Sequence, residues 1–278
     1  MTDAARRPEL PDATVVIVGV GLLGGSLGRA LSGRCAQRIG VVEDDDRDTA
    51  RTAVALDAVD TVEPLAEAMA AADIVVLATP VGTTLQLLRE VDRLVGPGTL
   101  VTDLGGAKGV IVEAMAQLRD DVEHVGGHPM CGGTTAGVGA SDPAMFIGAR
   151  WAVCPVARGA EGDGMGAAAR LSQVVEAVGA DPVVVDAGEH DRAVALVSHL
   201  PRVVAAQLVD CRESIQDAGD RELATILASR GWRGATRLAA GDEAMWDDVL
   251  AANADALAPQ LRALAARLVA TADRLTPS

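Results

Sequence analysis

The chain has 278 residues, enough for one large domain or two ordinary ones, and nearly half of them are apolar, so a substantial core can be buried. Its formal net charge of −15 would repel a nucleic-acid backbone and an anionic membrane, and one Phe, three Trp and no Tyr leave few rings for base stacking. We therefore expect neither nucleic acid nor a membrane as a partner.

The N-terminal segment, Met1 to Asp12, is polar and lacks the apolar core of a secretory signal, and no apolar run approaches the roughly 18 residues of a membrane span. A cytoplasmic location is expected. The cysteines lie far apart without a CxxC spacing, which predicts neither a disulfide framework nor a zinc site. We interpret them as buried or idle thiols: Cys35, Cys131, Cys154 and Cys211.

Strands and helices alternate through the first two thirds of the chain. Short β-branched runs predict buried parallel strands at Thr14 to Val18, Ile39 to Glu43, Ile74 to Ala78, Leu100 to Asp103, Trp151 to Val156 and Pro182 to Asp186. Helical spacing of apolar residues predicts helices at Leu22 to Leu31, Thr83 to Leu94, Gly109 to Leu118 and Gly164 to Val178. This alternation is typical of an open α/β sheet.

The strand pattern stops after Ala187, and the remaining sequence is rich in alanine and leucine. Helical periodicity predicts helices at Asp191 to Cys211, Asp220 to Ala228 and Ala244 to Leu275. We therefore expect two domains, an α/β domain in residues 1–187 and an all-helical domain in residues 188–278.

A glycine motif follows the first predicted strand and opens the first predicted helix. Its residues are Gly19, Val20, Gly21, Leu22, Leu23 and Gly24, a GxGxxG sequence. In this context the first glycine allows a tight turn, the second lets a pyrophosphate approach the backbone, and the third lets helix pack on strand. The motif predicts a doubly wound, mostly parallel Rossmann domain that binds a dinucleotide at these residues.

Four acidic residues follow the second predicted strand, about twenty residues beyond the motif: Glu43, Asp44, Asp45 and Asp46. An acidic side chain here accepts hydrogen bonds from the ribose hydroxyls and repels a 2′-phosphate, so NAD is expected rather than NADP. The candidate ribose ligands are Glu43 and Asp44, and sequence register favours Asp44. A solvated acidic turn explains Asp45 and Asp46 better.

Further polar residues follow other predicted strands, at the sheet edge where ligands bind in open α/β folds. Thr79 and Pro80 come after the Ile74 to Ala78 strand, and we expect them to contact the cofactor. His128 lies in a Gly/Pro sequence that we interpret as a loop, where a functional and a merely solvated histidine are equally compatible with the pattern. A metal pair of His124 with His128 is disfavoured, since no third ligand is near in sequence.

These segments resemble the prephenate/arogenate dehydrogenase family in order and spacing, over about Val15 to Leu257. The resemblance is carried by the glycine motif, the strand-end segments and four further motifs: GGHPM at 126–130, HD at 190–191, SHLP at 198–201 and GWRGATR at 231–237. It implies NAD-dependent oxidative decarboxylation of a cyclohexadienyl carboxylate in tyrosine formation, by an enzyme that forms a homodimer through its C-terminal helices.

The resemblance also implies roles for individual residues. His128 is then the catalytic residue that hydrogen-bonds the substrate 4-hydroxyl, His199 lies nearby in the site, and Arg237 holds a substrate carboxylate. The chemistry is consistent with these residue types, because a neutral imidazole can accept the hydroxyl proton and a guanidinium is a two-point anchor for a carboxylate. For any single arginine the alternative is a surface salt bridge.

Three positions depart from the family pattern, all on the substrate side. Gly106 stands where the family usually has serine, Thr134 where it often has glutamate, and Arg202 where it commonly has histidine. Arg202 could add a second cationic contact to the substrate. The departures would suit a homologue acting on an amino analogue such as 4-amino-4-deoxyprephenate. A catalytically silent NAD-binding regulatory protein is a separate alternative, and the retention of His128, His199 and Arg237 argues against it.

Overall fold

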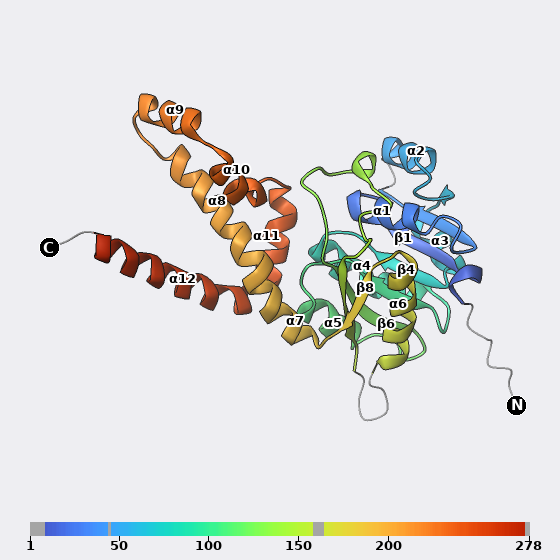
Figure 1. The fold of residues 1–278 in the computed structure, drawn as a ribbon. Coiled ribbons are helices and arrows are strands. Elements are labelled where there is room, and N and C mark those ends of the chain that lie inside the picture. Colours follow the sequence, from blue (N-terminus) through green and yellow to red (C-terminus); the bar gives the residue numbers. More distant parts are fainter. Residues whose placement is uncertain (1–8, 44–45, 158–163, 276–278) are drawn as a thin grey trace, which may run out of the picture. The chain divides into compact units, whose positions relative to one another are not determined.

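The computed structural model describes residues 9–43, 46–157 and 164–275 (Figure 1). The chain divides into two compact units, Met1–His190 and Asp191–Ser278.

In the described part of the first unit, eight strands form one sheet in the order β3-β2-β1-β4-β5-β6-β7-β8. Neighbouring strands are parallel except β6 and β7, which are antiparallel. The order reverses between β1 and β4, as in a doubly wound nucleotide-binding sheet, which confirms the predicted fold class. The strands are β1 (Thr14–Val18), β2 (Gln37–Val41), β3 (Thr61–Val62), β4 (Ile74–Leu77), β5 (Leu100–Asp103), β6 (Glu123–Pro129), β7 (Arg150–Pro155) and β8 (Asp181–Val184).

Three expectations about the sheet are wrong. The run at Pro182 to Asp186 is predicted to be buried, but Val183 and Val184 of β8 are exposed at the edge of the sheet. The run at Trp151 to Val156 was expected to be parallel to its neighbours, but β7 runs antiparallel to β6, since the intervening chain returns β7 in the opposite direction. β3 and β6 are absent from the predicted strands. β6 contains two glycines and a proline, residues depleted in strands, and it becomes a strand through pairing on both sides.

Helices cover both faces of this sheet (Figure 1). Alternate residues of β1 point to opposite faces, and all of Val15, Val16, Ile17 and Val18 are buried. One core cluster joins Val15 and Ile17 to residues of α1 and α6. The helices of this unit are α1 (Leu22–Ala30), α2 (Arg47–Ala55), α3 (Leu65–Ala71), α4 (Val81–Leu94), α5 (Gly109–Met115) and α6 (Met165–Ala177), with short 3-10 turns η1 (Leu10–Asp12) and η2 (Val138–Ala140).

Every regular element described in the second unit is a helix, and short non-helical segments connect these helices. The predicted single helix from Ala244 to Leu275 is divided at Asn253, whose buried side chain makes hydrogen bonds away from the helix axis. The elements are α7 (Ala187–Val194), which begins in the first unit, a π-helical segment η3 (Ala195–His199), α8 (Leu200–Glu213), α9 (Ala218–Leu227), α10 (Arg230–Thr236), a 3-10 turn η4 (Arg237–Ala239), α11 (Glu243–Ala252) and α12 (Ala254–Leu275).

One continuous helical run, Ala187–Glu213, spans 27 residues and has an 18-residue window with a mean hydropathy of 1.3. By length and composition alone it could cross a membrane, although charged residues such as Arg202 interrupt its apolar sequence. A single helix of this kind is weak evidence for a membrane span, because a core helix of a soluble protein meets the same criterion.

Candidate functional site

The glycine motif forms a tight turn between the carboxyl ends of β2 and β4. Gly19 has φ +90°, and its amide donates a hydrogen bond to the carbonyl oxygen of Val41 at 2.9 Å. A Cβ at Gly19 would lie 2.8 Å from the carbonyl oxygen of Ala78 and 3.0 Å from Cγ2 of Thr79. Both the backbone angle and the space therefore require glycine at this position.

The other two glycines of the motif have different surroundings. A Cβ at Gly24 would lie only 2.1 Å from the carbonyl oxygen of Gly19, so the third glycine is required for close packing. At Gly21 no heavy atom lies within 4 Å of the Cβ position. Gly21 is the N-cap of α1 and makes no side-chain capping bond, and Leu22 and Leu23 form the first turn. Open space over exposed helix amides fits a nucleotide pyrophosphate.

The acidic segment after β2 separates into two kinds of residue. Glu43 is exposed, two residues beyond the end of β2. Asp46 caps α2 by accepting a hydrogen bond from the amide of Thr49 at 3.0 Å, and hydrogen bonds from Thr49 lower the pKa of the Asp46 carboxyl. Asp44 and Asp45 lie outside the described residues. Of the predicted ribose ligands, only Glu43 can therefore be placed.

Thr79 and Pro80 follow β4 and lie beside the glycine turn. The Thr79 hydroxyl is 2.9 Å from the hydroxyl of Thr84, so it ties the strand end to α4. Pro80 is the N-cap of α4, where its fixed φ suits the helix start. These two residues shape the edge of the turn whether or not they touch a nucleotide.

A buried ion pair lies between β5 and β6, beneath the peptide that precedes His128. The ammonium of Lys108 pairs with the carboxylate of Asp103, and neither side chain is exposed. Asp103 Oδ1 accepts a hydrogen bond from the amide of Gly127 at 3.1 Å, and Lys108 Nζ donates to the carbonyl oxygen of Gly127 at 2.8 Å. The pair thus hydrogen-bonds both the amide and the carbonyl group of Gly127, and this carbonyl belongs to the peptide bond that joins Gly127 to His128.

His128 lies in β6, opposite Ala152 of β7, and not in the loop that its Gly/Pro neighbourhood predicted. The glycines before it are strand residues, because the β7 ladder continues across them. His128 is half-buried, and its Nδ1 is 2.9 Å from Nε2 of His190, the buried histidine of α7. The two rings meet edge to face, with an interplanar angle of 73°.

Two of the three departures from the family pattern belong to this unit. Gly106 lies in the segment between β5 and α5. Thr134 is exposed in the segment after β6, and a Cβ on the neighbouring Gly133 would lie 3.2 Å from Cδ2 of Leu22. This segment therefore passes the first turn of α1, at the glycine motif.

A second cluster of predicted residues lies in the helical unit, around the π-helical segment. His199 is fully buried, and its Nδ1 is 3.1 Å from Nδ2 of Asn253, which also donates to the carbonyl oxygen of Asp191 at 2.8 Å. The Trp246 ring meets His199 edge to face at 6.2 Å and lies 5.6 Å from Cζ of Arg202. His199 and Arg202 thus both contact the same indole ring.

Arg202 is 6% exposed, and its Nε has no hydrogen-bond partner among the described residues. A buried guanidinium on an aromatic face with an unused donor is suited to an anion. In contrast to the buried Arg202, Arg237 is exposed. It lies at the start of η4, which packs against α8.

Sequence reasoning missed several of these partners. Asp103 ends a predicted strand and Lys108 follows it by five residues, and an Asp and a Lys at the end of a buried strand could have signalled a buried pair. His190 stands in a quoted motif without an assigned role. Trp246 and Asn253 carried no signal, because their contacts join elements far apart in the sequence.

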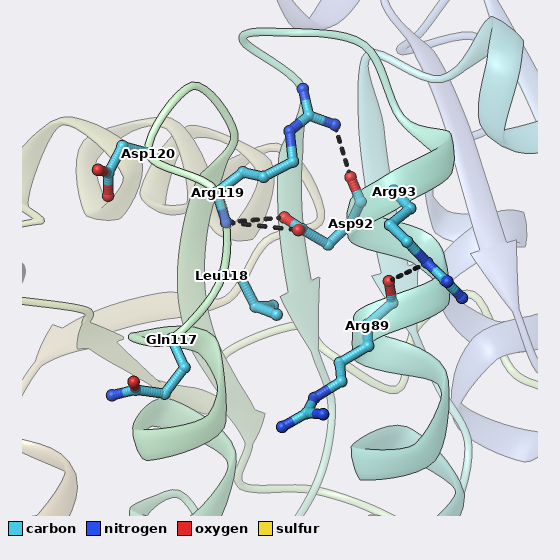
Figure 2. A pocket seen from close by; sticks show the side chains of 7 residues that line it. All are labelled: Arg89, Asp92, Arg93, Gln117, Leu118, Arg119 and Asp120. Carbon is cyan, nitrogen blue, oxygen red and sulfur yellow. Dashed lines mark hydrogen bonds between the residues drawn. The ribbon is translucent and has the colours of Figure 1, made fainter.

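A surface depression of about 530 Å³ lies apart from the glycine turn and from His128 (Figure 2). It is lined by the last turns of α4 and the segment before β6, at the amino edge of the sheet. The guanidinium groups of Arg89, Arg93 and Arg119 point in different directions, and the Asp92 carboxylate faces the amide of Arg119. The arginines do not converge on one point, so we do not assign the nucleotide or substrate site here.

Metal and thiol chemistry find little support among the described residues. No group of three or more His, Cys, Asp or Glu among them could hold a metal ion. Burial raises the pKa of the Cys131 thiol to about 11, so it is protonated at neutral pH and a poor nucleophile. Cys131 follows closely after His128 but brings no thiolate to the site.

Comparison with known proteins gives one family for both parts of the chain. Residues 27–184 match the model of the prephenate dehydrogenase nucleotide-binding domain, and residues 186–276 match that of the prephenate dehydrogenase dimerization domain. A prephenate dehydrogenase of Lactococcus lactis is 31% identical over 242 residues, covering 86% of this chain. The chain spans 64% of that relative's length.

Two solved structures are similar over nearly the whole chain. Prephenate dehydrogenase from A. aeolicus, in complex with hydroxyphenyl propionate and NAD+, has a TM-score of 0.85 and 26% identity and covers 96% of this chain and 92% of its own. Arogenate dehydrogenase of Synechocystis has a TM-score of 0.74 and 30% identity, covering 92% of this chain and 89% of its own. With both of its parts matched to the two domains of one enzyme, the chain belongs to the prephenate dehydrogenase family.

Proposed function

We propose that this chain is an NAD-dependent dehydrogenase that oxidatively decarboxylates prephenate or arogenate in tyrosine biosynthesis, in the cytoplasm. The observation that carries the proposal is the match of residues 27–184 and 186–276 to the two domains of a single dehydrogenase family. The similar proteins are named for prephenate and for arogenate, and one of them binds NAD+. Both substrates therefore stay within the proposal.

The glycine turn would hold the dinucleotide. Its pyrophosphate would lie over the open face of Gly21 and accept hydrogen bonds from the first amides of α1, while Gly19 and Gly24 keep the turn closed. Glu43 would accept hydrogen bonds from the adenosine ribose, as would Asp44, and Thr79 and Pro80 would border the turn. When bound, the nicotinamide supplies the acceptor for a hydride from the substrate ring.

His128 is the proposed base. The substrate 4-hydroxyl gives its proton to the imidazole as its oxygen becomes a carbonyl oxygen and C4 loses hydride. The bond from C1 to its carboxylate then breaks, carbon dioxide leaves, and the bonding electrons aromatise the ring. The imidazolium of His128 returns the proton to the phenolate oxygen, so the histidine ends the cycle neutral.

The cationic and polar residues of the helical unit are proposed to bind the substrate. Arg237 would anchor one carboxylate through its planar fork of donors, and Arg202, with a buried and unused Nε, would bind a second carboxylate. His199, held by Asn253, would border the site with its ring fixed in one orientation. Gly106 and Thr134 are also proposed as substrate-binding positions, and Thr134 would offer a hydroxyl.

Steady-state assays with purified protein test the proposal directly. Prephenate, arogenate and 4-amino-4-deoxyprephenate are each supplied with NAD, and the aromatic product and reduced cofactor are measured. Turnover of prephenate or arogenate to a 4-hydroxyphenyl product supports the proposal. Turnover of the amino analogue alone, or tight NAD binding without turnover of any of the three, refutes it.

The helical unit is proposed to form a homodimer. Several of its large apolar side chains are exposed in the single chain: Leu196, Val197, Leu223, Ile226, Leu227, Leu268 and Val269. When a second copy covers such side chains, apolar surface is removed from water, which stabilises the dimer. The match of residues 186–276 to a dimerization domain supports the same assembly.

A further inference from the structure

The proposed base has a buried histidine as its neighbour. His128 Nδ1 and His190 Nε2 are 2.9 Å apart, a normal hydrogen-bond distance between ring nitrogens. His190 is 4% exposed, whereas His128 is half-buried at the end of a strand. The contact therefore joins a residue that can face a ligand to one that is enclosed by protein.

Hydrogen bonds fix the backbone at or next to both histidines. The His190 amide donates to the carbonyl oxygen of Asp186 at 2.9 Å, and the Asp186 carboxylate caps α7 by accepting from the amides of Gly188 and Glu189. The backbone before His128 is held by the β7 ladder and by the Asp103–Lys108 pair. The short nitrogen-to-nitrogen distance is thus set by regular elements and not by a loop.

The hydrogen bond constrains which nitrogen of each ring carries a proton. A ring nitrogen is either a donor or an acceptor, so one of the two contacting nitrogens is protonated and the other is not. A base must offer an unprotonated nitrogen. If His128 takes the substrate proton on Nε2, its Nδ1 carries the ring proton and His190 Nε2 is the acceptor.

We propose that His190 is the positioning residue of His128: its Nε2 accepts the His128 Nδ1 proton, which selects the tautomer with a basic Nε2 and fixes the ring plane. The inference rests on the proposed function, because it assigns a partner to the proposed base. When the substrate proton reaches His128 Nε2, the resulting imidazolium strengthens the hydrogen bond from Nδ1 to His190. Return of the proton to the phenolate restores the neutral pair.

The tautomer can be measured without cofactor or substrate. The chain has four histidines, so long-range proton–nitrogen correlation spectra contain only four imidazole spin systems, assignable by single substitutions. We expect protonated Nδ1 and unprotonated Nε2 for His128 in the unchanged protein, and a shift toward protonated Nε2 in His190→Ala. A His128 ring with protonated Nε2 in the unchanged protein overturns the inference, whatever the enzyme acts on.

Kinetics separate positioning from folding. His190→Ala should lower kcat at least about tenfold with little change in KM, because the base is misoriented while substrate contacts stay. His190→Gln, whose amide oxygen can accept from His128 Nδ1, should recover much of that loss. The matched control is His124→Gln, a buried histidine at the other end of β6 that should keep kcat.

Thermal unfolding of all three variants gives the stability comparison. A fall in kcat that is equal in His190→Ala and His124→Gln, or that follows unfolding temperature across the set, assigns a structural role and overturns the inference. The same holds for a His190→Ala enzyme with normal kcat. If no substrate is turned over even by the unchanged protein, the proposed function fails, and the tautomer spectra still decide the hydrogen-bond assignment.

Discussion

Lys108 and Asp103 form an ion pair in which neither side chain is exposed to solvent, and together they hold the amide and the carbonyl of Gly127. Removing one partner of such a pair leaves a buried charge without compensation. The pair therefore couples the stability of the sheet to the position of His128, the next residue.

We expect Lys108→Met to lower the free energy of unfolding by about 3–5 kcal/mol, since the Asp103 carboxylate stays buried without its partner. Urea unfolding measures this. Arg51→Met, which removes the exposed pair with Asp48, is the control and should change little. A Lys108→Met protein as stable as the control would show that the buried carboxylate is relieved in another way.

Substitutions at two glycines of the same motif should have opposite consequences. Gly24→Ala brings a Cβ within 2.1 Å of a backbone oxygen and should destabilise the fold, whereas Gly21→Ala points into open space and should leave unfolding unchanged. Because that space is where the pyrophosphate would lie, Gly21→Ala should weaken NAD binding at least about tenfold. Calorimetric titration with NAD measures the loss, and an unchanged Kd in Gly21→Ala would move the cofactor elsewhere.

The exposed acid after β2 should set the choice of cofactor. We expect kcat/KM with NAD to exceed that with NADP at least about tenfold, because Glu43 would face a 2′-phosphate. Glu43→Gln removes the repulsion and should narrow the ratio, while Glu67→Gln, an exposed acid on α3, should leave it unchanged. Equal use of both cofactors by the unchanged protein would contradict the assignment.

Replacement of His128 should mainly change kcat, whereas replacement of Arg237 should mainly change KM. His128→Asn removes the base and should lower kcat at least about a hundredfold with little change in KM. If kcat/KM of the unchanged protein falls toward acidic pH, a fall that we call the acid limb of its pH profile, this fall should be absent in His128→Asn. Arg237→Ala should mainly raise KM, since a carboxylate loses a charge-assisted partner worth roughly 1.5 to 3 kcal/mol. Near-normal kcat and an unchanged acid limb in His128→Asn would make His199 the next candidate for the base.

Assembly can be tested on two side chains of equal exposure. Ile226 of the helical unit and Ile147 of the first unit are each 70% exposed in the single chain. At micromolar concentration the protein should sediment as a dimer, Ile226→Glu should shift it toward monomer, and Ile147→Glu should not. A monomer in the unchanged protein would contradict the proposed homodimer.

The fold class was predictable because its signals are local. β-branched runs, helical spacing and a glycine motif at a strand-to-helix junction depend only on neighbouring residues. These sequence patterns predicted less where the structure of an element depends on contacts with another element. β6, with its glycines and proline, becomes a strand through β5 and β7, and the last predicted helix is divided at Asn253, whose side chain makes hydrogen bonds to residues more than fifty positions away.

The sequence by itself determined the Rossmann-type sheet, the glycine turn and the family, since these follow from patterns of neighbouring residues and from motif order. Only the tertiary structure decided that Lys108 is buried against Asp103, that His128 contacts His190, and that Trp246 contacts both His199 and Arg202. Side-chain partners of this kind come from different elements. Their distances depend on how strands register and helices pack, which residue order does not specify locally.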